Sequence, residues 1–132
     1  MSSSLNQDVE DGNAVRDAGK SLLPLHALPV DSLHEVEAVI DGDAESLLLY
    51  RDPAGDVRAW LNICPHAGRR LDWAPGKFLR AKDGALVCAA HGASFELAHG
   101  ECISGPCRGE RLREVAVHCI DDDVRLGAAH AA

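Results

Sequence analysis

The amino-acid sequence predicts an all-β fold, a small antiparallel sandwich or barrel with its chemistry on projecting loops. Short apolar runs alternate with clusters of Gly, Pro and Asp, which is typical of strands joined by hairpin turns. None of the segments shows the 3.6-residue apolar stripe of an amphipathic helix. The 132 residues suit one domain around a single hydrophobic core.

The first half of the chain predicts a tail followed by three strands. Residues 1–21 are rich in Ser, Asp, Asn and Gly, and without apolar periodicity they are expected to form a flexible tail. Apolar runs then occupy residues 36–40, 46–50 and 57–63, separated by the turn sequences DGDAE and DPAGD. Three consecutive antiparallel strands are the expected result.

The second half predicts shorter strands around long connections. A strand over residues 85–88 follows the turn Lys82-Asp83-Gly84, and another covers residues 94–97. The last run, over residues 115–120, alternates apolar and mixed residues and is expected to close the sheet. Residues 128–132 are expected to be a short C-terminal tail.

Charge and composition exclude several classes of function. The net charge of −8, from 21 acidic and 13 basic residues, would repel nucleic acid; it favours a basic protein partner, or merely keeps the chain soluble. The N-terminal residues carry no export signal and no apolar run nears the roughly 20 residues of a membrane span. We therefore expect a cytoplasmic protein, whose five cysteines serve as thiols or metal ligands rather than as a disulfide framework.

Two short motifs combine a cysteine with a histidine. They are Cys64-Pro65-His66 and Cys88-Ala89-Ala90-His91-Gly92, each placed where a predicted strand ends. Thiolate and imidazole are the ligands of zinc and of iron–sulfur centres. A zinc finger usually pairs Cys with Cys and His with His, whereas here each loop supplies one of each, which suits a two-iron centre with both thiolates on one iron.

The segments CPHAG and CAAHG resemble the two cluster-binding boxes of Rieske proteins, and the likeness extends over residues 25–126. The resemblance implies one [2Fe-2S] cluster, with Cys64 and Cys88 on one iron and His66 and His91 on the other.

The same resemblance implies a domain organisation. Residues 22–127 would form the Rieske domain, with the two box loops projecting from it as a cluster-binding subdomain. Pro106 matches the proline-bearing loop that covers the cluster from a third side in this family.

The departures from the family pattern concern the cluster's surroundings. Arg69 and Ala90 occupy the positions of an extra cysteine pair in high-potential members, so the disulfide between the boxes cannot form. Ala93 and Phe95 replace a Ser and a Tyr that donate hydrogen bonds to the cluster sulfurs. We expect a potential low in the Rieske range of roughly −150 to +300 mV. The interval between the boxes is a few residues longer than usual, which leaves the path of residues 72–80 open.

The likeness is greatest to the soluble Rieske ferredoxins of bacterial oxygenase systems. It implies a one-electron carrier that takes electrons from a flavin-dependent reductase and passes them to a terminal oxygenase, with no catalytic residues and no stand-alone activity. Three alternatives remain: a small Rieske-like subunit of a nitrite reductase, a zinc-stapled β domain that binds a partner without redox change, and a redox sensor.

The remaining cysteines and aromatic residues have more ordinary expectations. Cys102 and Cys107 flank the proline loop and could form a disulfide or a redox-sensitive pair, but free structural thiols are expected in a reducing cytoplasm. Cys119 is expected in the core of the last strand. A packing role is expected for the aromatic residues Trp60, Trp73 and Phe78.

Overall fold

The computed structural model describes residues 19–65, 68–89 and 92–128, and over these residues the fold is almost entirely β. The helical content of the described residues is one short 3-10 turn, η2 (Leu25–Ala27), and none of their helical structure has the length and apolar character that a bilayer crossing requires. The strands are β1 (Ser21–Pro24), β2 (Ser32–Ile40), β3 (Asp43–Arg51), β4 (Val57–Leu61), β5 (Leu79–Arg80), β6 (Leu86–Val87), β7 (Ser94–Phe95), β8 (Cys102–Ser104), β9 (Glu114–Val115), β10 (Val117–Ile120) and β11 (Asp123–Leu126).

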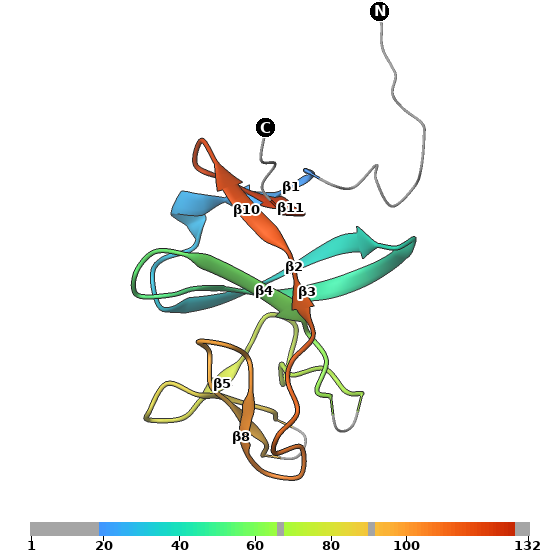
Figure 1. The fold of residues 1–132 in the computed structure, drawn as a ribbon, viewed down its shortest axis with the longest axis vertical. Coiled ribbons are helices and arrows are strands. Elements are labelled where there is room, and N and C mark those ends of the chain that lie inside the picture. The colour runs from blue at the N-terminus through green and yellow to red at the C-terminus, as the bar shows by residue number, and fades with distance from the viewer. Residues whose placement is uncertain (1–18, 66–67, 90–91, 129–132) are drawn as a thin grey trace, which may run out of the picture.

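The strands form three antiparallel sheets, stacked from one end of the molecule to the other (Figure 1). A three-stranded sheet has the order β1-β11-β10, and the middle sheet has the order β2-β3-β4-β9. A third sheet, in the order β5-β6-β7-β8, lies at the other end. The predicted all-β class is confirmed, and the sandwich is the pair formed by the first two sheets.

The β2–β3 hairpin is the longest paired unit. Its register joins Ile40 to Asp43, so the connection is the two-residue turn Asp41-Gly42. Both residues have positive φ, 51° and 87°, as the tight hairpin turns with an Asp-Gly sequence require. β2 begins at Ser32, four residues before the predicted strand, because Ser32 already pairs with Arg51.

The predicted strand over residues 115–120 is divided between two sheets, so the expectation that it closes a single sheet was wrong. β9 pairs with β4, whereas β10 pairs with β11, and Ala116 separates them. The amide of Gly127 donates to the carbonyl of Ala116 at 2.8 Å, which joins the start of β10 to the end of β11. The chain therefore passes from the middle sheet to the three-stranded sheet within one extended segment.

The middle sheet separates two hydrophobic cores. Successive side chains of a strand point to opposite faces, so Leu49 and its neighbour Leu48 enter different cores. Leu49 packs with Val124 of the three-stranded sheet. Leu48 and Trp60 pack with Phe95 of the third sheet. The third sheet thus shares its hydrophobic core with one face of the middle sheet.

Two expectations about packing were wrong. Cys119 lies in β10 as predicted, but it is exposed rather than in the core; it stands two residues before the turn at Asp121 and Asp122 that closes the β10–β11 hairpin. Trp73 is 58% exposed, and the ammonium of Lys77 lies 5.9 Å from its ring centroid. Trp60 is buried as expected.

Candidate metal centre

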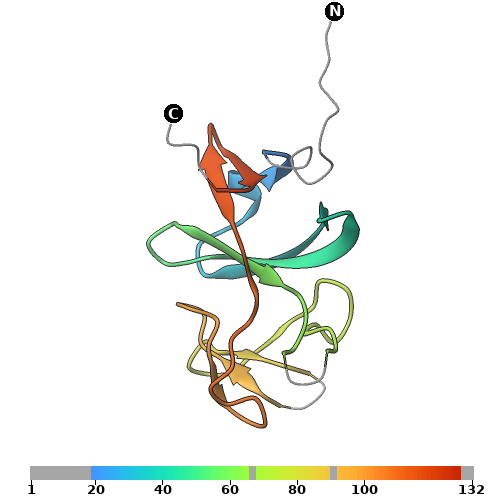
Figure 2. The ribbon, with the colours of Figure 1, turned by 45° about the vertical axis from the view of Figure 1, so that its right-hand side comes forward.

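The two cysteines of the predicted boxes are both completely buried, and they lie in the same core. Cys64 follows β4 and Cys88 follows β6, and each is 0% exposed. Both pack into the core that Phe95 and Leu86 form in the third sheet. The flanking segments lie at the end of the molecule opposite β10 and β11 (Figure 2). The structure therefore brings together two predicted ligands that are 24 positions apart in the sequence.

The two loops have the same backbone hydrogen bonds. In the first, the amide of Cys64 donates to the carbonyl of Arg69 at 2.6 Å, and the amide of Gly68 donates to the carbonyl of Cys64 at 2.8 Å. In the second loop the corresponding pairs join Cys88 with Ala93 at 2.7 Å and Gly92 with Cys88 at 2.8 Å.

Each loop turns at a glycine in the left-handed region, Gly68 at φ 68° and Gly92 at φ 72°, a conformation that other residues adopt with strain. Among the residues that the structure describes, a Cβ added at either glycine would meet nothing within 4 Å. Two matched loops that begin at buried cysteines are a suitable frame for a metal group with two thiolate ligands.

The two predicted histidine ligands, His66 and His91, lie outside the described residues. Among the residues that are described, no group of three potential metal ligands is assembled, which is consistent with half of the predicted ligand set being outside them. Their assignment as ligands stays a prediction.

The proline loop packs directly against the second box loop. Ser94 in β7 pairs with Ser104 in β8, and Gly105 follows at φ 100°. A Cβ at Gly105 would stand 2.8 Å from the Cα of Ala93, so only glycine permits this approach. Ala93 is fully buried.

The two cysteines that flank the proline loop extend this group of sulfurs. Cys102 and Cys107 are buried free thiols in the core that contains Cys64 and Cys88, with their sulfurs 2.9 Å apart. Burial, the hydrogen bond to Cys102 and the nearby sulfur of Cys64 raise the pKa of Cys107 to about 12. The sequence placed both cysteines beside the loop, but only the fold shows that Cys107 lies next to a predicted ligand.

A buried carboxylate fixes the segment that follows the first box. Both oxygens of Asp72 accept hydrogen bonds from Arg70, at 2.9 and 2.8 Å, and one also accepts from Asn62 at 3.1 Å and from the amide of Gly76 at 3.1 Å. Burial opposes the charged form, but these hydrogen bonds prevail and hold the pKa of Asp72 below its ordinary value. The amide of Leu71 donates to Asn62 at 3.1 Å.

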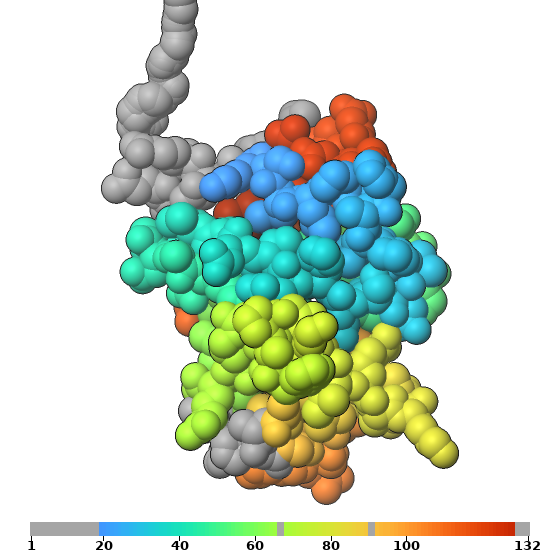
Figure 3. All heavy atoms as spheres, turned by 180° about the vertical axis from the view of Figure 1, so that it is seen from behind, coloured from blue at the N-terminus to red at the C-terminus, as the bar shows by residue number. Residues whose placement is uncertain are grey.

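The amino-acid sequence did not predict this hydrogen-bond network around Asp72. The network defines the path of residues 72–80. The amide of Trp73 donates to the carbonyl of Lys77 at 3.0 Å, so the segment forms a tight turn around the Asp72 carboxylate before β5. Arg70 also reaches Glu35 of β2 at 3.4 Å. Seen from behind, the yellow-green segment after β4 lies directly against β2 and β3 (Figure 3).

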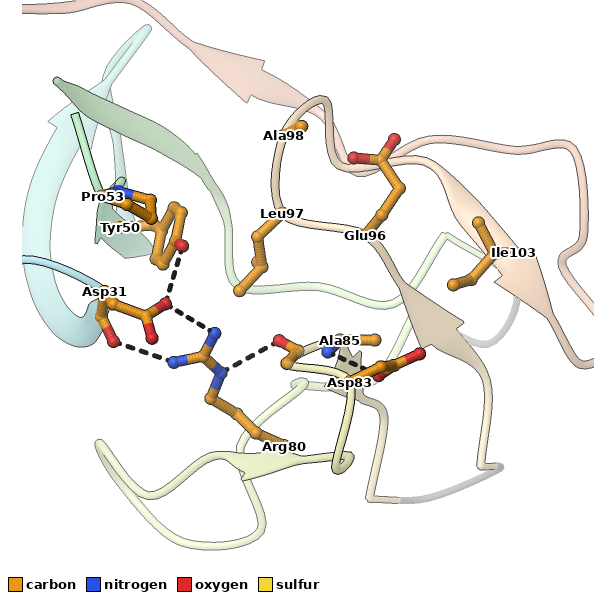
Figure 4. A pocket seen from close by; sticks show the side chains of 11 residues that line it. Asp31, Tyr50, Pro53, Arg80, Asp83, Ala85, Glu96, Leu97, Ala98 and Ile103 are labelled. Atoms are coloured by element: carbon orange, nitrogen blue, oxygen red, sulfur yellow. Dashed lines mark hydrogen bonds and ion pairs between the residues drawn. The ribbon is translucent and has the colours of Figure 1, made fainter.

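A hollow of about 330 Å³ lies between the middle and third sheets. Its cation, Arg80, donates to the carboxylate of Asp31 at 2.9 Å and to the carbonyls of Asp31 at 2.8 Å and Gly84 at 3.0 Å (Figure 4). Tyr50 donates to the same carboxylate at 2.8 Å. The polar groups of this hollow join the two sheets to each other, which is a structural role.

Comparison with known families gives a match to the Rieske [2Fe-2S] domain over residues 25–121. In sequence, the chain is 38% identical over 63 residues to the oxidoreductase NdmD of Pseudomonas putida. That match covers 47% of this chain but only 10% of NdmD.

Solved structures share the fold. The ferredoxin of carbazole 1,9a-dioxygenase from Nocardioides aromaticivorans IC177 has a TM-score of 0.61 at 20% identity, with 85% of this chain and 99% of that chain covered. A protein described as the small subunit of an NADPH nitrite reductase has a TM-score of 0.56 at 22% identity, with 82% and 96% covered. At these identities the likeness concerns the fold.

Proposed function

The chain belongs to the Rieske [2Fe-2S] domain family, and from this premise we propose that it carries single electrons, with one cluster held by Cys64, His66, Cys88 and His91. The observation that carries the proposal is the pair of matched loops, each of which begins at a buried cysteine and closes through the same two backbone hydrogen bonds. When bound, the cluster supplies a reversible one-electron couple.

The residues around the proposed site bind the cluster and exclude water from it. Cys64 and Cys88 would supply the thiolates, from a core that Phe95 and Leu86 seal. His66 and His91 would supply the imidazoles, and their assignment rests on the sequence motif alone. The fully buried Ala93 and Phe95 have no side-chain donors for the cluster sulfurs. We therefore propose a potential low in the Rieske range.

The domain is proposed to span residues 22–127, between tails at 1–21 and 128–132, and to act in the cytoplasm. The fold shared with a dioxygenase ferredoxin supports a role between a flavin-dependent reductase and a terminal oxygenase, without stand-alone turnover. The protein described as a nitrite reductase small subunit shares the fold as well. This chain, however, has both Cys–His boxes and therefore a complete proposed ligand set, which favours the electron carrier.

Electron counting tests this function. The purified protein is titrated anaerobically with dithionite, reoxidised with ferricyanide and titrated again. We expect one electron per chain to enter and leave in each cycle, with the visible absorption falling on reduction and returning fully on reoxidation. A chain that takes up no electrons, or whose chromophore is destroyed on the first reduction, would contradict the carrier role.

A further inference from the structure

The buried thiols of Cys102 and Cys107 are close to bonding distance. The Cys107 thiol donates to the sulfur of Cys102 at 2.9 Å, and the Cys102 thiol donates to the carbonyl oxygen of Ser104 at 3.3 Å. Sulfurs in a disulfide are about 2.05 Å apart, so a shift of about 1 Å would allow a bond. Both cysteines are free thiols in the structure.

The chain between the two cysteines is short: Ile103 and Ser104 complete the edge strand β8, and Gly105 and Pro106 follow it. Residues 103–106 are all exposed, whereas both cysteines are buried beneath them. The loop is held at its base, where the amide of Cys102 donates to the carbonyl of Glu110 at 2.8 Å and the amide of Glu110 donates to the carbonyl of Cys107 at 2.8 Å. Exposed loops with few buried contacts open at low free-energy cost. Local opening of the edge strand β8 would therefore expose the thiols to a small reagent while the β5–β6–β7 part of the sheet stays paired.

The pair contacts both box loops. Cys107 lies in the same buried core as Cys64, and the nearby Cys64 sulfur contributes to the raised pKa of Cys107. Gly105, between the two cysteines, touches the backbone of Ala93 in the second loop. A change in the bonding of the pair therefore acts on a predicted ligand of the first box and on the backbone of the second.

We propose that Cys102 and Cys107 are a redox-active thiol pair that a small disulfide oxidises to an intrachain disulfide, and that the state of this pair adjusts the potential of the cluster. One thiolate of the pair attacks the small disulfide, which leaves a mixed disulfide and releases one small thiol. The second thiolate attacks the bound sulfur, forms the Cys102–Cys107 bond and releases the second small thiol. Two electrons and two protons pass from the pair to the reagent.

The direction of the effect on the cluster follows from hydrogen bonding. Donors to cluster sulfurs stabilise the reduced, more negative state and raise the potential. Disulfide formation removes both S–H groups of the pair from the core that also contains Cys64 and Cys88, so the oxidised pair gives the lower potential. This second step rests on the proposed function, whereas disulfide formation does not.

A mass measurement tests the pair. The full-length protein is equilibrated anaerobically in glutathione buffers that range from fully reduced to fully oxidised, and its remaining thiols are alkylated. Cleavage after Glu101 and Arg108 gives the peptide Cys102–Arg108, which contains only these two cysteines. We expect this peptide to become two hydrogens lighter and free of alkyl groups as the buffer becomes oxidising.

Matched variants control the assignment. The variant C119S, which changes the exposed cysteine of β10, should give the same titration as the parent. The variants C102S and C107S should never give the bridged peptide. If the peptide stays doubly alkylated in the most oxidising buffer, or carries two glutathione adducts instead of the internal bond, the proposed pair is refuted.

The cluster potential is then measured by spectroelectrochemistry in the dithiol and disulfide forms. A lower potential in the disulfide form of the parent supports the coupling, provided that C107S shows no such shift after the same two treatments. Equal potentials in the two forms of the parent overturn it. Failure of the proposed function is recognised separately, because a protein without the cluster still gives the peptide result.

Discussion

Gly100 lies against the indole of Trp60 in a position that no other residue fits. A Cβ there would stand 2.6 Å from the indole Nε1, and the residue has a φ of 74°. Trp60 is fully buried beneath it in the core shared with the third sheet. The change Gly100→Ala combines left-handed backbone strain of about 1–2 kcal/mol with an overpacking cost of about 1–3 kcal/mol.

We expect Gly100→Ala to lower the free energy of unfolding by about 2–5 kcal/mol, measured by chemical denaturation. Gly109 is a matched control, because its φ is 95° but a Cβ would meet nothing within 4 Å. Gly109→Ala should cost only the backbone strain. Equal losses of unfolding free energy in the two variants would show that the contact with Trp60 does not contribute to the destabilisation.

Substitution of a cysteine by serine should have different effects on cluster content at different positions. Cys64→Ser or Cys88→Ser removes a proposed thiolate ligand, so we expect the variant to lose its bound iron and acid-labile sulfide. Cys119→Ser changes an exposed residue and should retain both. Iron and sulfide analysis of the three purified variants decides, and a full complement in Cys64→Ser would remove that residue from the ligand set.

Residue spacing predicts part of the site. The positions of Cys64 and Cys88 at the ends of strands could be predicted, because the boxes are local sequence features. The position of Cys107 beside Cys64 could not, because it depends on how the proline loop packs into the core around the first box. Asp72 gave no signal, since one acidic residue in a loop looks the same in sequence whether it is exposed or buried.

At the scale of elements, the turn after the first box depends on the Asp72 carboxylate, whose side chain is 1% exposed. Its pKa is lowered, so the folded state binds its proton less readily than the unfolded state does. The stabilisation is therefore fully present above the ordinary carboxyl pKa of about 4, and it is lost as the pH falls through the lowered folded value.

We expect Asp72→Asn to destabilise the protein by about 1–3 kcal/mol at neutral pH, through loss of charge-assisted hydrogen bonds. The difference from the parent should shrink below pH 4, as denaturation curves between pH 7 and pH 3 would reveal. Asp43→Asn, at an exposed site, is the control. A difference that is constant with pH would refute the role of the charge.

The predictability of the strands depends on their length and on their partners. The strands β2, β3 and β4 have five to nine residues and clear turn signals, and the sequence predicted them. The two-residue strand β5 is too short to show a period, so tertiary pairing alone defines it. β11 was missed because its acidic start, at Asp123, resembles a turn.

At the scale of the molecule, the third sheet is attached to the middle sheet by a shared core and by polar contacts that include two ion pairs. Leu48 and Trp60 of the middle sheet pack with Phe95, while Arg70 and Arg80 connect the third-sheet region to Glu35 and Asp31. Ion pairs near the surface contribute about 0–1 kcal/mol, so the core should dominate the attachment.

Phe95→Ala should therefore cost about 3–5 kcal/mol, whereas Arg80→Met should cost less than about 1 kcal/mol. Because the core is shared, both variants should unfold in a single transition, followed together by tryptophan fluorescence and far-ultraviolet circular dichroism. Two separated transitions would show that the third sheet unfolds independently of the other two sheets.

The central claim is that this fold holds a [2Fe-2S] cluster for one-electron transfer. The most direct measurement is iron, zinc and acid-labile sulfide analysis of the purified protein, with visible absorption before and after dithionite. We expect two irons and two sulfides per chain in a coloured protein that bleaches on reduction. A colourless protein with one zinc per chain, even after cluster reconstitution, would contradict the claim.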